Sequence, residues 1–155
     1  MFRSLIATAK DSAPTIARII LGVVIFPHGA QKAFGWFGGP GIEGTMGYLH
    51  GMMHIPVVFV WLAILAELLG SLGLIAGFLG RVAAFGIAFN MAIAVAMTHL
   101  ANGFFMNWSG QQKGEGYEYH LLALALAAIV VVKGSGAYSV DRALTERAAA
   151  PASTR

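Results

Sequence analysis

Four long apolar runs dominate this chain, and each is close to the length of a helix that crosses a lipid bilayer. They cover about residues 13–33, 55–79, 80–100 and 115–133. A helix rises about 1.5 Å per residue, so about 20 residues cross a hydrocarbon core that is roughly 30 Å thick. The runs therefore predict an all-α integral membrane protein, a four-transmembrane-helix bundle that forms a single domain over residues 1–155.

The composition agrees with a lipid environment. Apolar residues make up 57% of the chain and charged residues only 11%, whereas soluble domains carry about 25% charged residues. The net charge is +3, but the basic residues form no continuous stripe, so we expect the lipid bilayer and no nucleic acid as a partner. The chain has no cysteine, which excludes a disulfide framework and a thiolate metal site.

Lys and Arg are unevenly distributed between the two ends of the predicted bundle. Cytoplasmic connections of membrane proteins are enriched in these residues. Only Lys32 and Lys113 fall at one end, whereas the other eight of the ten basic residues fall at the end that holds both termini. We therefore expect both termini to be cytoplasmic and the connections after the first and third runs to face outward. The eight residues are Arg3, Lys10, Arg18, Arg81, Lys133, Arg142, Arg147 and Arg155.

The connection between the first two runs is rich in glycine and aromatic residues. The sequence GGPG at residues 38–41 predicts a turn. Residues 42–53 then predict a short interfacial helix, with Trp36, Phe37 and Tyr48 at the depth of the lipid headgroups. The alternative is that these aromatic residues form only an anchoring belt.

Several polar side chains interrupt the apolar runs. Ionisable groups inside membrane helices are costly and usually mark a paired or functional site. Glu67 lies midway along the second run, whereas His28, His99 and His120 lie toward the outer ends of the other three. The helical rise places Glu67 roughly 10 Å or more below the histidines. The topology thus predicts three imidazoles in one layer above a submerged carboxyl group.

These polar residues also have structural interpretations. Glu67 could hold helices together as a buried acid, or pair with Lys32, and the histidines could bond to backbone groups. Asn90 lies nine positions before His99, about half a turn away on an ideal helix, so we expect Asn90 to bond a neighbouring helix instead. A metal site is conceivable, because three histidines and Glu67 are available. No two of these four residues have the i, i+4 spacing of a metal motif and they come from different helices, so we predict no metal site.

Small residues and shared helix faces give further detail. Gly73 and Gly77 form a GxxxG pair, which predicts close helix packing. His28, Gln31 and Lys32 are spaced i, i+3 and i+4, so they share one helix face.

A dense polar and aromatic segment, NGFFMNWSGQQKGEGYEYHLL, covers residues 102–122. We expect Asn107 and Trp108 to form the rim of an outward-facing pocket. Glu115 and Glu118 would cap the start of the last helix, where acidic groups complement the helix dipole, and His120 would point inward. The alternative is a solvated loop.

Three stretches of this sequence resemble the DoxX family of bacterial inner-membrane proteins. They are FPHGAQKAFGWFGGPG at residues 26–41, LAELLGSLGLIAGFLGR at residues 65–81 and the polar segment 102–122. The similarity covers about residues 15–142. Its H-G-x-x-K pattern and its acid followed by glycines match His28, Gly29, Lys32, Glu67, Gly70 and Gly73.

The resemblance implies a four-helix bundle of the inner membrane that takes part in respiratory or redox-stress systems. Relatives include the large membrane subunit of thiosulfate:quinone oxidoreductases and proteins linked to quinone detoxification. We therefore expect a quinone-interacting redox protein, with a further subunit or redox partner because the sequence offers no electron carrier of its own. Without cysteine, thiol-based transfer would need another subunit.

In this interpretation Glu67 carries protons deep in the membrane, and the three histidines contact the quinone head group. The expected catalytic residues are Glu67, His28, His99 and His120. Other residues expected to bind the quinone are Gln31, Lys32, Trp36, Asn107, Trp108 and Glu118. Two alternative functions remain: a non-catalytic membrane scaffold or chaperone that recruits a protein partner, and a small-solute transporter that acts as a homo-oligomer.

Overall fold

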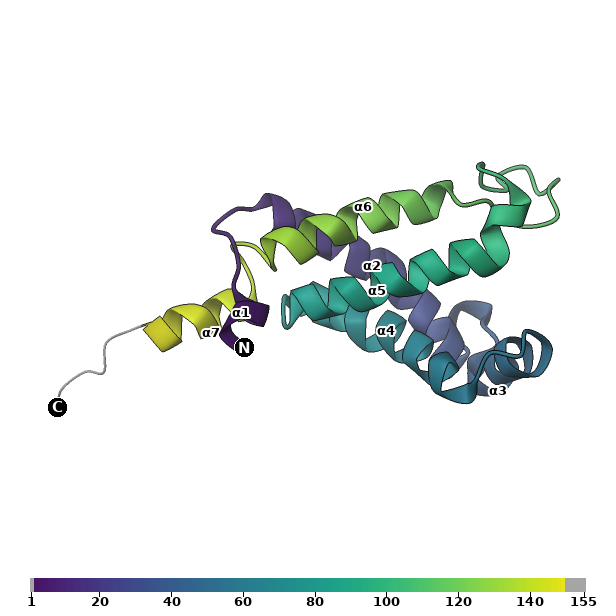
Figure 1. Ribbon diagram of the computed structural model, residues 1–155, viewed down its shortest axis with the longest axis horizontal. Helices are drawn as coiled ribbons and strands as arrows, with labels where there is room; N and C mark the ends of the chain where they lie inside the picture. Colours follow the sequence, from purple (N-terminus) through teal and green to yellow (C-terminus); the bar gives the residue numbers. More distant parts are fainter. Residues whose placement is uncertain (1, 150–155) are drawn as a thin grey trace.

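Four long helices form the body of this protein in the computed structural model, which describes residues 2–149 (Figure 1). Every regular element in that part of the chain is helical. Met1 and residues 150–155, Arg155 among them, lie outside the described part. The four helices are α2 (Ala13–Phe34), α4 (Val57–Ala76), α5 (Gly80–Ala94) and α6 (Glu118–Lys133).

Short helical elements connect and flank these four helices. The α5 helix continues into the π-helix η3, so that helical structure runs from Gly80 to Asn102. The short elements are α1 (Phe2–Ile6), η1 (Trp36–Gly38), α3 (Gly41–Met46), η2 (Gly47–Met52), η3 (Val95–His99), η4 (Leu100–Asn102) and α7 (Val140–Ala149).

Three helical segments of the described chain are long and apolar enough to cross a membrane. They are Ala13–Phe34, Val57–Ala76 and Gly80–Asn102. Their outer faces carry large exposed apolar side chains, such as Ile16, Phe59 and Phe85, which is the surface expected of helices that face lipid. The prediction of an all-α membrane protein is confirmed at this level. The α6 helix has 16 residues, fewer than a typical span.

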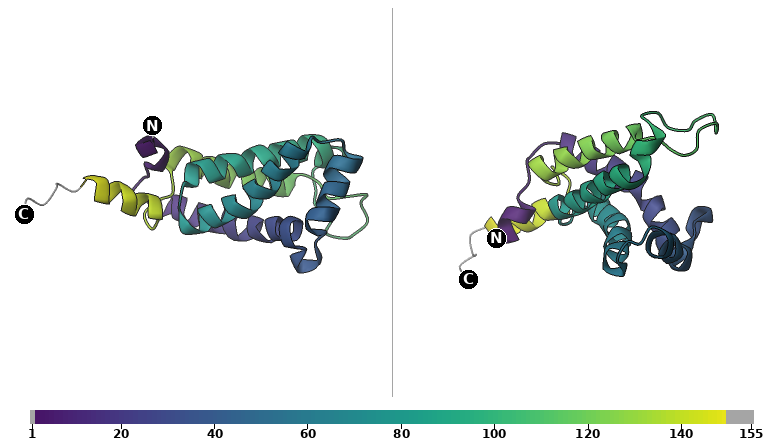
Figure 2. Two further views of the ribbon diagram at one scale, coloured as in Figure 1. Left: turned by 90° about the horizontal axis from the view of Figure 1, so that it is seen from below. Right: turned by 45° about the vertical axis from the view of Figure 1, so that its right-hand side comes forward.

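The four long helices pack as a ring. The α2 helix packs against α4 and α6, and α5 packs against the same two helices. Figure 2 shows this arrangement from two further directions. Apolar side chains from all four helices fill the centre, including Leu21, Ile25, Leu74, Ile87 and Val130.

The α2 and α4 helices approach closely where glycines of α2 face the backbone of α4. A Cβ added to Gly29 would lie 2.6 Å from the Leu68 backbone nitrogen, so only glycine fits there without movement. Gly22, seven positions earlier, has the same role against Ser71. This contact fixes α2 against the part of α4 that carries Glu67.

Gly77, expected to pack with Gly73 on one face of a helix, ends α4 in a left-handed conformation with φ of 70°. Left-handed glycine is a common helix C-cap. It is closely packed there, because an added Cβ would lie 2.5 Å from the Ser139 Cβ. The close approach between α2 and α4 depends on Gly22 and Gly29 of α2.

The two ends of the bundle differ in character. The first and last described helices, α1 and α7, pack together at one end, called here the proximal end. The connections at residues 35–56 and 100–117 lie at the other, distal end (Figure 1). The histidines and Lys32 of the predicted site are near the distal end, as the topology predicted.

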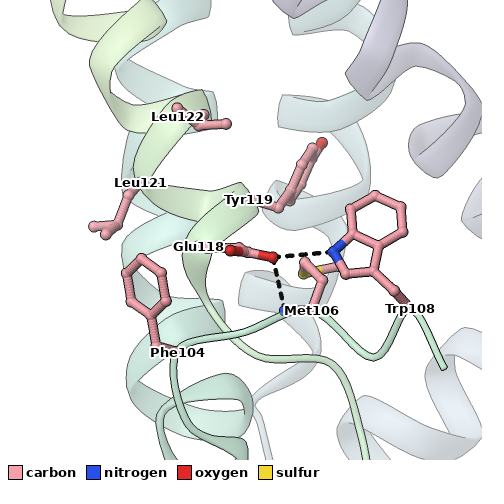
Figure 3. A pocket seen from close by; sticks show the side chains of 7 residues that line it. All are labelled: Phe104, Met106, Trp108, Glu118, Tyr119, Leu121 and Leu122. Atoms are coloured by element: carbon pink, nitrogen blue, oxygen red, sulfur yellow. Dashed lines mark hydrogen bonds between the residues drawn. The ribbon is translucent and has the colours of Figure 1, made fainter. Parts of the chain in front are cut away.

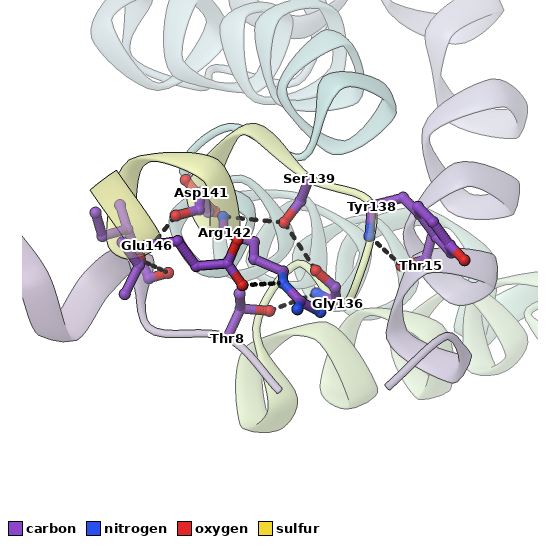
Figure 4. Close-up of polar contacts among 10 residues, drawn as sticks. Thr8, Thr15, Gly136, Tyr138, Ser139, Asp141, Arg142 and Glu146 are labelled. Carbon is purple, nitrogen blue, oxygen red and sulfur yellow. Dashed lines mark hydrogen bonds and ion pairs between the residues drawn. The ribbon is translucent and has the colours of Figure 1, made fainter. Parts of the chain in front are cut away.

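Polar contacts close the proximal end. The Ser139 hydroxyl donates to the Gly136 carbonyl at 2.8 Å and accepts from the Arg142 backbone N–H at 3.2 Å (Figure 4). The Asp141 carboxylate accepts the backbone N–H groups of Leu79 and Gly80 at 2.8 and 3.0 Å. The start of α7 therefore caps the start of α5.

Candidate functional site

Glu67 is buried at the centre of the bundle and both of its carboxylate oxygens have partners. Its Oε2 lies 2.6 Å from Lys32 Nζ of α2, which forms an ion pair. Its Oε1 accepts a hydrogen bond of 2.8 Å from Asn90 Nδ2 of α5. Glu67 thus has the ion-pair partner that was one of its structural interpretations, and Asn90 bonds a neighbouring helix as expected.

The local sequence explains why these three groups meet. Gly29 brings the α2 backbone against Glu67 and Leu68. Lys32 follows Gly29 by three positions, so it lies on the same helix face one turn farther along. Removing one partner of a buried ion pair leaves an uncompensated charge in a medium of low dielectric constant. Since Lys32, Glu67 and Asn90 belong to α2, α4 and α5, their contacts link these three helices.

The three histidines of the site form an arc with a tyrosine between them. The rings of His99 and His120 are 4.1 Å apart between centroids. Tyr119 lies 5.3 Å from His120 and 6.1 Å from His28. The arc therefore joins α2, η3 and α6.

The three histidines have different surroundings. His120 is buried, with 5% of its surface exposed. His99 Nδ1 lies 2.9 Å from the Glu115 carbonyl oxygen. His28 is exposed on α2, and its ring contact within the arc is with Tyr119. Of the three imidazoles expected in one layer, His99 and His120 are the two whose rings pack on each other.

The arc and the buried carboxylate belong to one polar region. His28 interacts electrostatically with both Lys32 and Glu67, and Tyr119 interacts with Glu67. Within residues 2–149, no hydrogen bond or ion pair joins Glu67 to a histidine. Movement of a proton between the arc and Glu67 therefore needs an intermediate group.

Two buried polar atoms in the arc have no hydrogen-bond partner among the described residues. They are the Tyr119 hydroxyl oxygen and His120 Nδ1. A buried polar group without a partner costs about 1–3 kcal/mol, and such groups are rare in folded proteins. They are the atoms that a polar group of a ligand would satisfy. Sequence reasoning did not select Tyr119, although its position directly before His120 in an apolar helix was a usable signal.

A hollow of about 660 Å³ lies beside the arc, on the outside of α6 (Figure 3). Most of its wall is apolar, and Tyr119 is part of it. We call it the α6 hollow. Its lining residues are Phe104, Met106, Trp108, Glu118, Tyr119, Leu121 and Leu122.

Glu118 accepts hydrogen bonds from two other residues in the wall of the α6 hollow. Its Oε1 accepts the Met106 backbone N–H at 2.9 Å and the Trp108 indole N–H at 3.2 Å (Figure 3). Trp108 is otherwise 88% exposed. Asn107, expected at the rim, is instead held inside its own loop, where its side chain bonds to the Gln112 backbone.

A second hollow, of about 330 Å³, lies between α2 and the α3–η2 segment. We call it the α3 hollow. It is lined by Gln31, Lys32, Pro40, Gly44, Thr45, Tyr48 and Leu49.

The residues expected to form one pocket are therefore divided between two hollows. Gln31 and Lys32 line the α3 hollow, whereas Trp108 and Glu118 line the α6 hollow. Trp36 lines neither of these two, because it packs against Phe34 and Phe37 on the exposed connection after α2. In residues 2–149, no three His, Asp or Glu side chains are grouped so that they could hold a metal ion.

Arg18 and Arg81, expected only as topology markers, both bind backbone carbonyl groups of other segments. Arg81 donates to the Ala7 and Val132 carbonyls at 3.1 and 3.0 Å. Arg18 is 1% exposed and donates to the Leu74 and Ile75 carbonyls at 2.6 Å each, and to the Ser135 and Tyr138 carbonyls. It thereby satisfies free carbonyl groups at the end of α4.

Apolar helices around a buried ion pair and a partly apolar hollow define an α-helical membrane protein with a polar site near one end. The family model of DoxX matches residues 13–100, and the chain belongs to the DoxX family. The resemblance noted in the sequence is thereby confirmed. Membership links the chain to membrane proteins of redox and stress systems. No curated protein and no solved structure matches the chain.

Proposed function

We propose that this DoxX protein binds a lipid-soluble quinone in the α6 hollow and acts as one subunit of a membrane redox assembly. The observation that carries the proposal is the Tyr119 hydroxyl, a buried group of a residue that lines this hollow, which has no hydrogen-bond partner among the described residues. His120, the next residue of α6, has a second such atom, Nδ1. A quinone head group has an apolar ring and two oxygens that accept or donate hydrogen bonds, so it fits this combination.

The proposal includes α6 as a fourth membrane span. Its 16 residues cover about 24 Å at 1.5 Å per residue, and Leu122 and Val132 are exposed on its outer side. Most Lys and Arg residues lie at the proximal end, so this end would face the cytoplasm of a bacterial inner membrane. The α3 and η2 helices would then lie at the outer interface.

The residues of the arc would bind and orient the head group. Tyr119 and His120 would hydrogen-bond its two oxygens, and Phe104 and Trp108 would contact the apolar ring. His99 packs on His120 and would hold its ring in place. When bound, the quinone supplies the two-electron chemistry, and the electrons come from a partner subunit.

Glu67 and Lys32 would supply the site with protons. Glu67 interacts electrostatically with Tyr119 and His28, two residues of the arc. A carboxylate that gains a proton inside the membrane loses its charge, so the protonated state is tolerated there. Glu67 can therefore hold a proton between its entry and its use.

A scaffold is the second candidate function. The distal loop exposes Phe105 and Trp108, and exposed aromatic side chains are enriched at protein interfaces. In that case a partner protein would cover the loop, and the polar interior would serve only stability.

Equilibrium binding of a quinone to the purified protein in detergent tests the proposal. Tyr119→Phe removes one hydroxyl and should weaken binding about tenfold, which corresponds to one hydrogen bond of about 1.4 kcal/mol. Tyr138→Phe is the matched control, because the Tyr138 side chain is exposed at the proximal end. Absence of saturable binding, or equal affinities of the two variants, would contradict the proposal.

A further inference from the structure

Protons that reach Glu67 must pass one of its neighbours. The Glu67 side chain is 4% exposed, whereas the Lys32 side chain paired with it is 28% exposed. The other direct partner is Asn90, whose amide group does not exchange protons in the physiological range. His28 of α2 and Tyr119 of α6 interact with Glu67 only at longer range.

Lys32 connects the carboxylate with the α3 hollow. Its ammonium group has three protons, and Lys32 Nζ donates to Glu67 Oε2 with 2.6 Å between the two atoms. The same side chain lines the α3 hollow. The wall of that hollow is mostly apolar, and Gln31, Thr45 and Tyr48 contribute polar side chains beside Lys32.

The two hollows lie on different sides of the bundle. The α3 hollow lies between α2 and the α3–η2 segment, and the α6 hollow lies on α6 and the loop after η4. Figures 1 and 2 show α3 and α6 on opposite sides at the distal end. A molecule bound in the α6 hollow therefore leaves the α3 hollow open.

We propose that the α3 hollow is an aqueous entrance through which protons from the distal side reach Glu67 by way of Lys32. In the transfer step an Nζ–H bond of Lys32 breaks and an O–H bond forms at Glu67 Oε2. Lys32 then regains a proton from water at the hollow, so one proton enters in total. The inference extends the proposed function, because these protons would serve the quinone site, but the entrance itself works without quinone.

The lack of cysteine in the chain allows a direct test with single-cysteine variants. Tyr48→Cys introduces a thiol in the wall of the α3 hollow, and Ser109→Cys introduces one in the exposed distal loop as a matched control. Each variant is placed in phosphatidylcholine vesicles and treated with a membrane-impermeant methanethiosulfonate. Labelling of Ser109→Cys also reports which vesicles have the distal end outside.

Dicyclohexylcarbodiimide serves as the probe of Glu67 protonation, because it reacts with protonated carboxyl groups in apolar surroundings. The adduct on Glu67 is measured by mass spectrometry. After a drop in pH on the distal side, labelling of Glu67 should rise promptly. Thiol modification of Tyr48→Cys should slow this rise at least tenfold, and modification of Ser109→Cys should leave it unchanged. A rise that follows only the pH of the proximal side, or that is unaffected in Tyr48→Cys, would overturn the inference.

Lys32→Arg separates proton transfer from ion pairing. A guanidinium keeps the charge and the pairing with Glu67, but it does not give up its proton. We expect a folded protein, checked by its circular dichroism, in which labelling of Glu67 after the pH drop is at least tenfold slower. An unchanged rate in Lys32→Arg would exclude Lys32 as the relay. None of these measurements uses quinone, so failure of quinone binding alone would refute the proposed function and leave the entrance intact.

Discussion

Replacing Gly29 with alanine should separate the two helices that hold the ion pair. The added Cβ would lie 2.6 Å from the Leu68 nitrogen and 2.8 Å from the Leu68 Cα, both backbone atoms that cannot rotate away. Ordinary contact begins at 3.4 Å, so α2 and α4 must move apart locally by about 0.8 Å, which is 3.4 minus 2.6. The 2.6 Å ion pair between Lys32 and Glu67 would lengthen with them.

The expected cost of Gly29→Ala is about 1–3 kcal/mol, the usual range for an overpacked interior. Gly86→Ala is the matched control, because a Cβ at Gly86 would meet only the Ala66 Cβ at 3.7 Å. In a helix interior, alanine in place of glycine is favourable by roughly 0.5–1 kcal/mol, so the control should be neutral or slightly stabilised. Both free energies of unfolding can be measured by titration with sodium dodecyl sulfate in mixed micelles. If Gly29→Ala is as stable as Gly86→Ala, the close approach of the two helices is refuted.

Two further substitutions test the ends of the bundle. Arg18→Met removes charged hydrogen bonds to the carbonyls at the end of α4. It should lower the free energy of unfolding by about 3 kcal/mol, because bonds to charged groups contribute about 1.5–3 kcal/mol each. A loss below about 1 kcal/mol in the same titration would contradict the role of Arg18 as a buried donor. Glu118→Gln weakens the hydrogen bonds from the Met106 and Trp108 N–H groups. The Trp108 indole should therefore gain mobility, and the tryptophan fluorescence anisotropy of the protein should fall. An unchanged anisotropy would show that Glu118 does not hold the loop that contains Trp108.

The apolar runs predicted most of the fold, because burial in lipid imposes a simple length and composition on each helix. The same reasoning placed His99 and His120 at one end, since both follow from topology and helical rise. The interpretation of Glu67 as an ion-pair partner of Lys32 also required only charge and approximate depth. These features depend on properties that each segment carries by itself.

Features that depend on contacts between distant segments could not be predicted in this way. Arg18 binds carbonyls of residues that are 56 to 120 positions away, and its own sequence surroundings carry no sign of them. The exposure of His28 depends on the rotation of α2 about its axis, which Gly22 and Gly29 set through their contact with α4.

The predicted angle between Asn90 and His99 assumed an ideal helix, and the chain departs from one. A π-helical turn, Val95–His99, lies between these residues, and a π-helix changes the rotation between residues before and after it. Asn90 bonds Glu67 and His99 packs on His120, so the prediction that they do different things was right. The half-turn estimate by itself does not describe this helix.

Photoaffinity labelling is the most direct test of quinone binding in the α6 hollow, since it reports where a quinone contacts the chain. The protein in phosphatidylcholine vesicles is irradiated with an azidoquinone, with and without excess unlabelled quinone, and the modified peptides are mapped by mass spectrometry. If quinone binds in the α6 hollow, labelling should fall on residues 104–108 and 118–122, which contain its walls, and excess quinone should suppress it. Adducts spread along the outer faces of the helices, unaffected by the competitor, would contradict binding in this hollow.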